Sequence, residues 1–360
     1  MNILKNKKIA YVAFAPLHSL GVRKKVKNTC QALTNMGALS LIIINTSVSL
    51  KNVFRVIKML RDFRPEYIVL RHAGTLCFIL LPILLLYKIR GVKVILDIPT
   101  PLSIGLKETM ATDFGVKSFI SSLVLAIYTP FLNLTVDRIL QYGPEGRWFS
   151  LGASNKTYLT ANGYDPDSIK PQNKPLAFDL ELKLIAVAAV APWHGFDRII
   201  QGLAIYNKLN KVSVKVSFTI VGEGPDTDNL KVLVKKLNLE SSVDFRPTTA
   251  TEKLNSLYLE HHIGIATLGG FRKGISAASD LKSREYACAG IPFLSAVNDL
   301  DFPEGLFFVH RIPNQNIPVD ICSVIDFYKG VYREELPNEI RAYAVDTVPY
   351  EVKLRGMFDF

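Results

Sequence analysis

Short apolar stretches rich in β-branched residues alternate with longer stretches of helical period along the chain. The first apolar stretches are KIAYVAF, SLIIIN, YIVLR, KVILDI, RILQYG and TYLTANG. The segments between them, such as VRKKVKNTCQALTNMG, repeat apolar residues at the spacing of an amphipathic helix. Strands and helices in alternation predict an α/β fold with a parallel sheet covered by helices on both faces.

The alternation is interrupted once, by a polar and Pro-containing linker at 165–183. It then restarts with KLIAVAAV, KVSFTIVG, SVDFRP, HIGIATL, IPFLSA and LFFVH. The chain has 360 residues, which is longer than one core usually serves. We therefore expect two Rossmann-like, doubly wound domains that face each other across a cleft. The N-terminal domain covers 1–168, the second domain covers 169–340, and a helical segment over 341–360 returns to the first domain.

The basic excess of the chain is concentrated near its N-terminus. The formal net charge is +11, and no Asp or Glu precedes Asp62. A basic face of this kind attracts anionic lipid, a phosphorylated substrate or nucleic acid. The sequence has no basic residues interleaved with aromatic residues in the manner that stacks bases. We therefore expect an anionic membrane surface, and not nucleic acid, as the partner of the N-terminal domain.

Two segments, 75–89 and 118–136, are apolar enough to raise the question of a membrane. The first is shorter than the roughly 20 residues that a span needs, and the second contains Pro and polar residues. Buried domain helices are the favoured interpretation; helices that lie against a membrane leaflet, or a true span, stay open. The four cysteines are scattered without C-x-x-C spacing, and the start of the chain lacks the pattern of a signal peptide. We expect a cytoplasmic protein that is peripheral on the inner face of the cell membrane.

Two helix starts have residues suited to phosphate. Gly21 lies between the first strand and the first helix, where unpaired N–H groups bind anions, although a glycine needed only for the turn is the alternative. His194 and Arg198 lie four residues apart near the helix start at Gly195. They would share one helical face and could bind one phosphate group together. The alternative for Arg198 is an ion pair on the surface.

The segment DLKSREYACAGIPFLSA, residues 280–296, places two charges on a helix of small residues. Ser279 is the expected N-cap, and Lys282 and Glu285 are three residues apart, so they share a face. One interpretation is a salt bridge on a solvated surface. The other is functional, because a carboxylate accepts two hydrogen bonds from a sugar diol, while Lys282 and the helix N-terminus can bind a diphosphate.

The second half of the chain resembles the C-terminal, donor-binding domain of retaining GT-B glycosyltransferases of the family-4 type. The resemblance rests on four segments in this order: VAPWHGFDRII, FTIVGEGP, VDFRP and SREYACAGIPFLSA. NGYDPDSIKP, at 162–171, is similar to the interdomain segment of that family. The resemblance implies a nucleotide-sugar donor, bound mainly by the second domain, and no metal or other cofactor. It implies that Glu285 holds the nucleotide ribose, that Gly21 faces the donor phosphates, and that Arg246 and Pro247 lie where the base is bounded.

The chain departs from the family's pattern at three places. Ala277 stands where a second Glu is frequent, and His194 and Ala188 stand where cations are frequent. The charge of the diphosphate must then be balanced by other cations, for which Arg198, Lys282, Arg272 and Lys273 are available. The family's N-terminal-domain His is replaced by ILDIPTP.

Three residues near the expected cleft are candidates for a role in the reaction. Asp97, which lies in ILDIPTP, either orients the acceptor or the transferred sugar or caps the following loop. His18 is the second catalytic candidate, and His72 is a further one, each with a structural or solvated alternative. Two D-x-D triplets, Asp165/Asp167 and Asp299/Asp301, resemble metal-binding motifs of another transferase fold, but their positions in a linker and a loop indicate no metal site.

Together these observations predict a metal-independent, retaining glycosyltransferase. It would transfer a sugar from a nucleotide-diphosphate sugar to a lipid-linked or cell-surface glycan acceptor of the capsule, O-antigen or exopolysaccharide type. A non-catalytic GT-B scaffold or partner subunit, and a nucleotide-sugar epimerase, are the alternatives.

Overall fold

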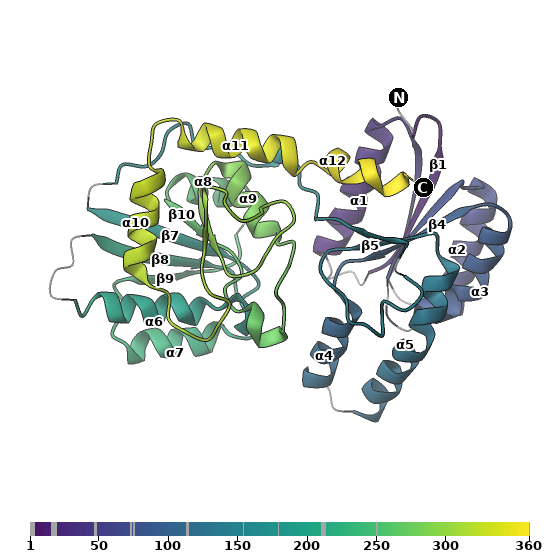
Figure 1. Cartoon of the computed structure of the whole chain (residues 1–360), viewed down its shortest axis with the longest axis horizontal. Helices are drawn as coiled ribbons and strands as arrows, with labels where there is room; N and C mark the ends of the chain where they lie inside the picture. The colour runs from purple at the N-terminus through teal and green to yellow at the C-terminus, as the bar shows by residue number, and fades with distance from the viewer. Residues whose placement is uncertain are drawn as a thin grey trace. The chain divides into compact units, whose positions relative to one another are not determined.

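The computed structural model describes residues 4–15, 20–46, 49–72, 74, 76–112, 115–153, 155–178, 180–209, 214–249 and 251–359. The chain forms two compact units (Figure 1). Unit 1 comprises Met1–Gly163 and Tyr350–Phe360, and unit 2 comprises Tyr164–Pro349.

The boundaries differ from the expected ones at 168/169 and 340/341. Tyr164 and Ile169 belong to the core of unit 2, so unit 2 begins before the expected position. Ile340 and Ala344 are buried in the same core, which retains the chain in unit 2 up to Pro349.

Unit 1 contains a six-stranded parallel sheet in the order β2-β1-β3-β4-β5-β6. Its strands are β1 (Lys8–Phe14), β2 (Leu39–Asn45), β3 (Tyr67–Arg71), β4 (Lys93–Ile98), β5 (Arg138–Gln141) and β6 (Thr157–Leu159). Its helices are α1 (Leu20–Asn35), α2 (Leu50–Phe63), α3 (Leu76–Ile89), α4 (Leu102–Thr112), α5 (Val116–Thr135) and α12 (Tyr350–Arg355), followed by a 3₁₀ turn at Gly356–Phe358.

Both faces of this sheet are buried, because successive side chains of a strand point to opposite faces. In β1, Ala10 and Val12 pack with α2, α3 and α5. Ile9, Tyr11 and Ala13 pack with α1 and α12 on the other face. The near-continuous apolar strands of the sequence follow from this two-sided burial.

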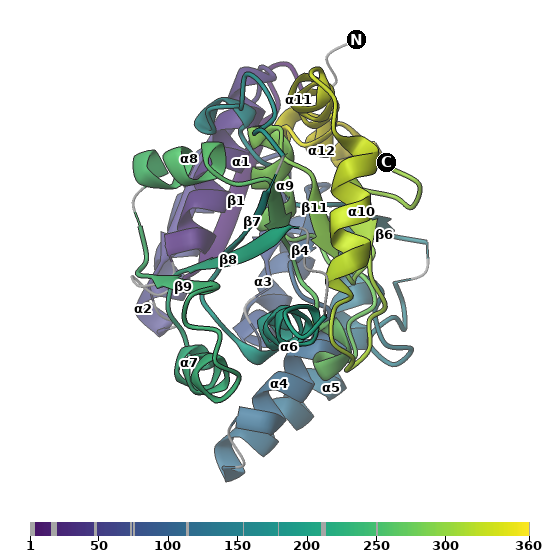
Figure 2. The ribbon, with the colours of Figure 1, turned by 90° about the vertical axis from the view of Figure 1, so that its left-hand side faces the viewer.

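Unit 2 contains a second six-stranded parallel sheet, in the order β12-β11-β10-β7-β8-β9. Its strands are β7 (Glu181–Val187), β8 (Lys215–Val221), β9 (Val243–Arg246), β10 (Ile263–Ile265), β11 (Phe293–Ser295) and β12 (Val309–Arg311). Its helices are α6 (Phe196–Tyr206), α7 (Thr227–Lys236), α8 (Thr251–Leu259), α9 (Leu281–Ala289), α10 (Ile321–Val331) and α11 (Leu336–Thr347), with 3₁₀ turns at Pro166–Ser168, Pro192–His194 and Gly270–Lys273. Figures 1 and 2 show α6 and α7 on one side of the sheet and α8 and α9 on the other.

The strand orders show where successive strands stop being added on one side of each sheet and continue on the other. In unit 2 the chain proceeds from β7 through β8 to β9 and then crosses to β10, so the switch point lies between β7 and β10. In unit 1 the equivalent point lies between β1 and β3. Ligands of open α/β sheets bind outside the carboxyl ends of the strands at such points. The two switch points are therefore the expected ligand-binding positions of the two sheets.

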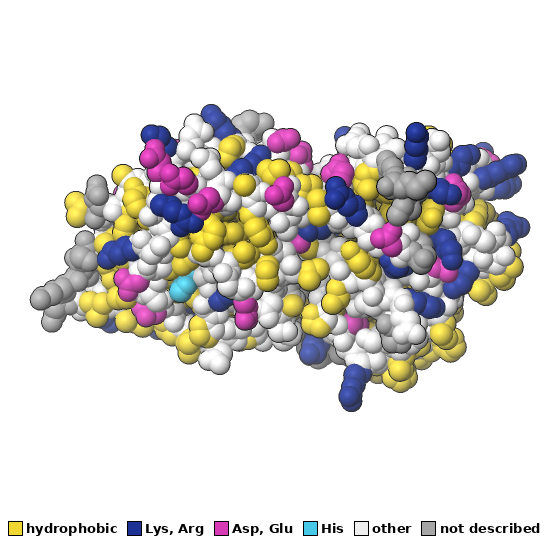
Figure 3. Space-filling view, turned by 45° about the horizontal axis from the view of Figure 1, so that its top comes forward, with side chains coloured by type: hydrophobic (Ala, Val, Ile, Leu, Met, Phe, Trp, Pro, Cys, Tyr) yellow, Lys and Arg dark blue, Asp and Glu magenta, His cyan; other side chains and the backbone are white. Residues whose placement is uncertain are grey.

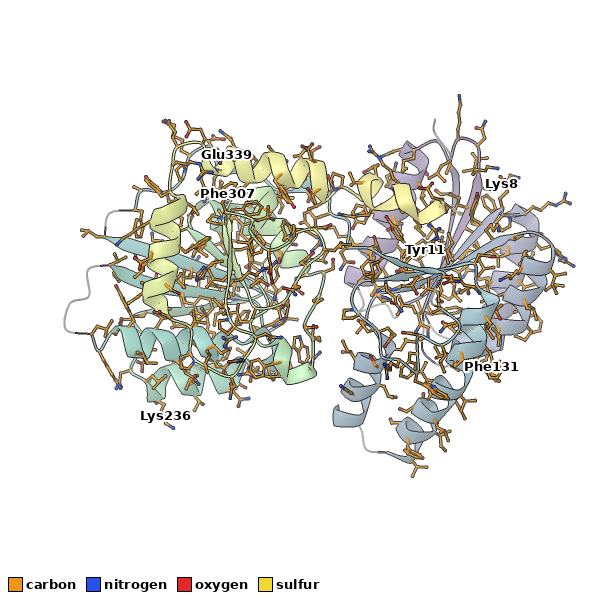
Figure 4. All side chains as sticks on the ribbon, in the orientation of Figure 1. Lys8, Tyr11, Phe131, Lys236, Phe307 and Glu339 are labelled. Carbon is orange, nitrogen blue, oxygen red and sulfur yellow. The ribbon has the colours of Figure 1, made fainter. Side chains whose placement is uncertain are left out.

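The two apolar segments of the sequence are α3 and α5, both in unit 1. Within α5, Ser118–Thr135 is long and apolar enough to cross a membrane, and 33% of it is buried. Phe131, which Figure 4 labels on α5, is 58% exposed. The exposed apolar side chains of these helices include Phe78, Ile79, Leu85, Leu86, Ile89, Val116, Phe119, Ile120, Leu123, Ile127 and Leu134. Burial in the core of unit 1 therefore explains the apolar residues on only one side of each of these two helices.

Candidate active site

The switch point of unit 2 is formed by two loops that pack backbone against backbone. Leu268 N donates to His194 O at 3.0 Å, and Gly269 N donates to Trp193 O at 3.2 Å. Gly195 has φ of 69°, and a Cβ on it would lie 2.6 Å from the Gly269 nitrogen. Only glycine combines this conformation with this approach. The loops after β7 and β10 thus form one rigid wall beside the start of α9.

Glu285, in α9, is held by two tyrosines from other parts of unit 2. Tyr258 Oη donates to Glu285 Oε2 at 2.8 Å, and Tyr164 Oη donates to Glu285 Oε1 at 3.2 Å. Burial, followed by the charge of Glu285, raises the pKa of each tyrosine, so both hydroxyls stay protonated and donate. The two tyrosines therefore fix the orientation of the carboxylate.

Lys282 lies one turn before Glu285, in the first turn of α9. The helix is preceded by Asp280 as its N-cap residue, and not by Ser279 as expected. Lys282 Nζ is half-buried, 3.4 Å from Thr267 Oγ1 and 5.7 Å from the centroid of the Phe196 ring. Burial lowers its pKa from the usual value. A partly desolvated cation therefore lies beside the loop after β10, at the positive end of α9.

His194 and Arg198 do not form the phosphate pair that their spacing predicted. Ala191 N donates to His194 Nδ1 at 3.2 Å, and the imidazole stacks on Phe196. Burial, with the charges of Lys282 and Lys273, lowers the pKa of His194 to about 2. His194 is therefore uncharged at neutral pH.

Arg198 is 1% exposed and serves the core of unit 2. Its guanidinium donates to the carbonyl oxygens of Ile317 at 2.7 Å, Pro313 at 2.9 Å and Leu268. The helix begins at Phe196, after His194, so the two side chains do not share a helical face. The prediction of joint phosphate binding, and of a surface ion pair for Arg198, is wrong.

Three other predicted cations have partners of their own. Arg272 forms a bidentate pair with Asp197 at 2.8 and 2.7 Å, and Lys273 Nζ lies 3.1 Å from the centroid of the Trp193 ring. Arg246 pairs with Asp244 at 2.7 Å, and it lines a polar hollow of about 550 Å³ over β7, β8 and β9. Its role beside a base stays a prediction.

The second D-x-D triplet belongs to a buried ion cluster. Arg284 is fully buried and donates to Asp299 at 2.8 and 2.9 Å and to Asp301 at 2.5 Å. Burial alone would lower the pKa of Arg284, but the two aspartates raise it above its usual value. In the first triplet, Asp165 accepts from Asp167 N at 3.1 Å at the start of a 3₁₀ turn. Among the residues that the structure describes, no cluster of three His, Cys, Asp or Glu could hold a metal ion.

Asp97 is placed inside β4 of unit 1 and is 1% exposed. Tyr11 Oη donates to Asp97 Oδ2, Arg71 Nη1 lies 3.3 Å from the same oxygen, and Lys25 Nζ lies 4.0 Å from Oδ1. Figure 4 shows Tyr11 within the sheet. Burial alone would raise the pKa of Asp97, but the charges of Lys25 and Arg71 and the hydrogen bond from Tyr11 lower it.

The cavity beside this cluster has a volume of about 30 Å³, which is about one water at liquid density. A sugar ring does not fit there. Asp97 therefore neutralises the partly buried cations Lys25 and Arg71, and neither loop capping nor direct contact with an acceptor matches its position.

Two further predicted residues, Gly21 and His72, lie near the switch point of unit 1. Gly21 is in the first turn of α1, exposed, and a Cβ on it would meet nothing within 4 Å. The structure thus gives no steric reason for this glycine, and its proximity to phosphate stays a prediction. His18 lies outside the described residues. His72 follows β3 directly.

Sequence reasoning missed Tyr164, Tyr258 and the partners of Arg284. Tyr258 looks like an ordinary apolar position of α8, and nothing in the sequence relates it to Glu285. Arg284 had a usable signal, because an arginine among small apolar helix residues needs buried acceptors. The two aspartates after β11 are the nearest such acceptors in the sequence.

Comparisons with known proteins agree with this architecture. No protein-family profile matches the chain. An uncharacterized glycosyltransferase of Haemophilus influenzae is 32% identical over 117 residues, which is 32% of this chain and 31% of that protein. The match thus spans less than a third of the curated relative. A glycosyltransferase from Rickettsia africae has a TM-score of 0.65 at 12% identity, covering 98% of this chain and 96% of that one. A variant of S. aureus TarM in complex with UDP has a TM-score of 0.52 at 14% identity, covering 86% and 59%. These structures show the fold, which is GT-B, as predicted.

Proposed function

We propose that the chain is a retaining glycosyltransferase that moves a sugar from a nucleotide-diphosphate sugar to a lipid-linked or cell-surface glycan acceptor. The observation that carries the proposal is the oriented carboxylate of Glu285, one helical turn from Lys282, beside the switch point of unit 2. The Haemophilus relative is named a glycosyltransferase, which supports sugar transfer. The TarM structure contains UDP, which supports a nucleotide-sugar donor.

In this proposal each residue near the start of α9 has one task. The carboxylate of Glu285, oriented by the two tyrosines, accepts hydrogen bonds from the two hydroxyl groups of the nucleotide ribose. Lys282 and the N-terminal N–H groups of α9 stabilise the diphosphate, on which negative charge develops as the sugar leaves. The proposal needs no metal, since a fixed cation and helix dipole supply the charge that the leaving group requires.

We further propose that unit 1 binds the anionic inner face of the cell membrane. Exposed apolar side chains of α3 and α5 are available for the interface region of a bilayer. Lys51 and Arg55 are exposed cations of α2, which covers the same face of the sheet as α3 and α5. Figure 3 shows both kinds of side chain on unit 1. Apolar contact and charge attraction together give stable membrane association where one alone is marginal.

The test of donor binding is a thermal-shift panel of UDP-, GDP- and dTDP-sugars with the wild type and Glu285→Ala. A donor at 100 times its dissociation constant stabilises the folded state by about 2.7 kcal/mol. We expect one nucleotide class to raise the melting temperature, and Glu285→Ala to lose that shift and the sugar transfer. A variant that keeps near-normal transfer would refute the role of Glu285. The anomeric configuration of the product, measured by NMR, tests retention.

A non-catalytic GT-B subunit is the second candidate, and the electrostatics of unit 2 favour it over an epimerase. His194 is uncharged, Arg198 is buried, and Ala277 stands where the family frequently has Glu. The site thus lacks charged groups that the family's pattern has for binding the donor. Nucleotide-sugar binding without nucleotide release, in the presence of membrane extracts that contain acceptors, would identify this candidate.

A further inference from the structure

Unit 1 has an apolar hollow of about 270 Å³ at the carboxyl ends of β3 and β4. Its floor includes His72 and Pro99, and its walls come from α4 and α5. The lining includes the side chains of Leu102, Leu106, Ser122 and Leu125. A cavity of about 150 Å³ lined by aliphatic side chains is already large enough for benzene. The hollow therefore has room for a hydrocarbon group of substantial length.

Charge is absent from the described lining of this hollow. His72 Nδ1 accepts from Gly74 N at 3.3 Å, and Nε2 lies 3.2 Å from Tyr128 Oη. Burial lowers the pKa of His72 to about 4, so the ring is neutral at physiological pH.

The N-terminus of α4, whose first residue Leu102 lines the hollow, is also neutralised. The carboxylate of Glu145 accepts from Ser103 N at 3.0 Å and from Leu102 N at the start of α4. An anion at this helix end would meet a carboxylate instead of open N–H groups. The hollow is therefore unsuited to a phosphate and suited to an uncharged, apolar group.

The helix α5 separates this hollow from an exposed apolar surface. Ser121, Ser122 and Leu125 line the hollow, at the spacing of one helical face. Phe119, Leu123 and Ile127 are exposed on other sides of the same helix. The outer sides of α5 therefore offer apolar side chains to the part of a hydrocarbon chain that extends beyond the hollow.

We infer that this hollow between α4 and α5 binds the hydrocarbon chain of an amphiphilic acceptor. The inference rests on the proposed function, and it specifies that function further: the acceptor is anchored by its acyl or prenyl part in unit 1, at the strand ends where ligands of open sheets bind. The polar part of the acceptor would then lie outside the hollow, beyond the neutral residues that line it.

The test measures binding of 1-hexanol, 1-octanol and geraniol to the full chain by isothermal titration calorimetry, without nucleotide sugar. Each added methylene that enters the hollow should tighten binding about fourfold, so octanol should bind about 16-fold more tightly than hexanol. Gly105→Leu fills the hollow, since Gly105 lines it and a Cβ there meets nothing within 4 Å. We expect this variant to weaken octanol binding at least tenfold.

Gly330→Leu is the matched control. Gly330 is also a helical glycine, in α10, and a Cβ on it likewise meets nothing within 4 Å, but it belongs to unit 2. This variant should bind octanol as the wild type does. If Gly105→Leu fails to fold by circular dichroism, Ser121→Leu fills the hollow from α5 instead.

The inference would be overturned if the wild type did not bind octanol. It would also be overturned if Gly105→Leu bound octanol as tightly as the wild type, which would place the alkanol on the exposed surface of α3 and α5. Failure of the proposed function gives a different result. The nucleotide-sugar panel would then show no shift, while octanol binding would persist.

Discussion

Replacing Tyr258 with Phe removes one hydroxyl and retains the ring that packs edge-on against Tyr286. The hydroxyl is 2.8 Å from Glu285 Oε2, and Tyr258 is fully buried. A hydrogen bond to a charged group contributes about 1.5–3 kcal/mol, against about 0.5–1.5 kcal/mol for a neutral pair. We expect Tyr258→Phe to lower the free energy of unfolding by an amount in the charged range.

Donor affinity should fall as well, because Glu285 loses the contact that fixes its carboxylate. If about 1.4 kcal/mol of that interaction serves to orient the carboxylate for ribose, the dissociation constant for the nucleotide rises about tenfold. Tyr164→Phe should have the smaller effect of the two, since its hydroxyl is 3.2 Å from Glu285. Urea unfolding measures the first quantity and calorimetric titration with the free nucleotide measures the second.

Tyr206→Phe is the matched control for this experiment. Tyr206 is a buried tyrosine of unit 2, and its hydroxyl donates to Val214 O at 2.8 Å, a neutral acceptor. It should reduce stability by about 0.5–1.5 kcal/mol and leave nucleotide affinity unchanged. In a Glu285→Gln background the stability cost of Tyr258→Phe should fall to this neutral range. The reasoning is refuted if Tyr258→Phe keeps wild-type nucleotide affinity, or if its stability cost is the same in both backgrounds.

Three further predictions concern buried charge. Arg284→Met leaves two buried aspartates without their cation and should lower the free energy of unfolding by about 3–5 kcal/mol, measured by urea denaturation; a loss below about 1 kcal/mol would contradict the buried cluster. Arg198→Met leaves three carbonyl oxygens without donors and should reduce stability without a specific loss of nucleotide affinity, which calorimetry on the folded fraction would check. The folded-state pKa of Asp97 is lowered, so its stabilising effect is complete above its unfolded pKa of about 3.9 and is lost as pH falls through the lower folded value. Asp97→Asn should therefore flatten the acid limb of a plot of unfolding free energy against pH, and an unchanged limb would count against the assignment.

The sequence predicted the strands and the fold well, because periodicity and two-sided burial are properties of short segments. Most apolar stretches named from the sequence became strands, including β7 and β8, which match KLIAVAAV and KVSFTIVG closely. Unit boundaries were less predictable. Residues 341–349 stay with unit 2 through the packing of Ile340 and Ala344, and that packing depends on partners distant in the sequence.

The candidate site was predicted less well than the fold, for an identifiable reason. Spacing along a helix predicts which residues share a face, but it does not predict whether that face contacts a ligand or the core. His194 and Arg198 were assigned by spacing, and Arg198 turned inward to three carbonyl groups. Asp97 was assigned because ILDIPTP replaces the family's His, and it lies inside β4 beside the largely buried cations Lys25 and Arg71.

Glu285 differs from these residues in the kind of partner it has. A carboxylate that serves the core is neutralised by a cation, as Asp299 and Asp301 are by Arg284. Tyr164 and Tyr258 orient Glu285 through uncharged hydroxyl groups, which fix the direction of the carboxylate without neutralising its charge. Arg284 and Glu285 are adjacent in α9, yet one is sealed in the core and the other is half-buried. This contrast between neighbours is the physical reason to assign donor recognition to Glu285. Arg284 instead holds the loop after β11 through Asp299 and Asp301.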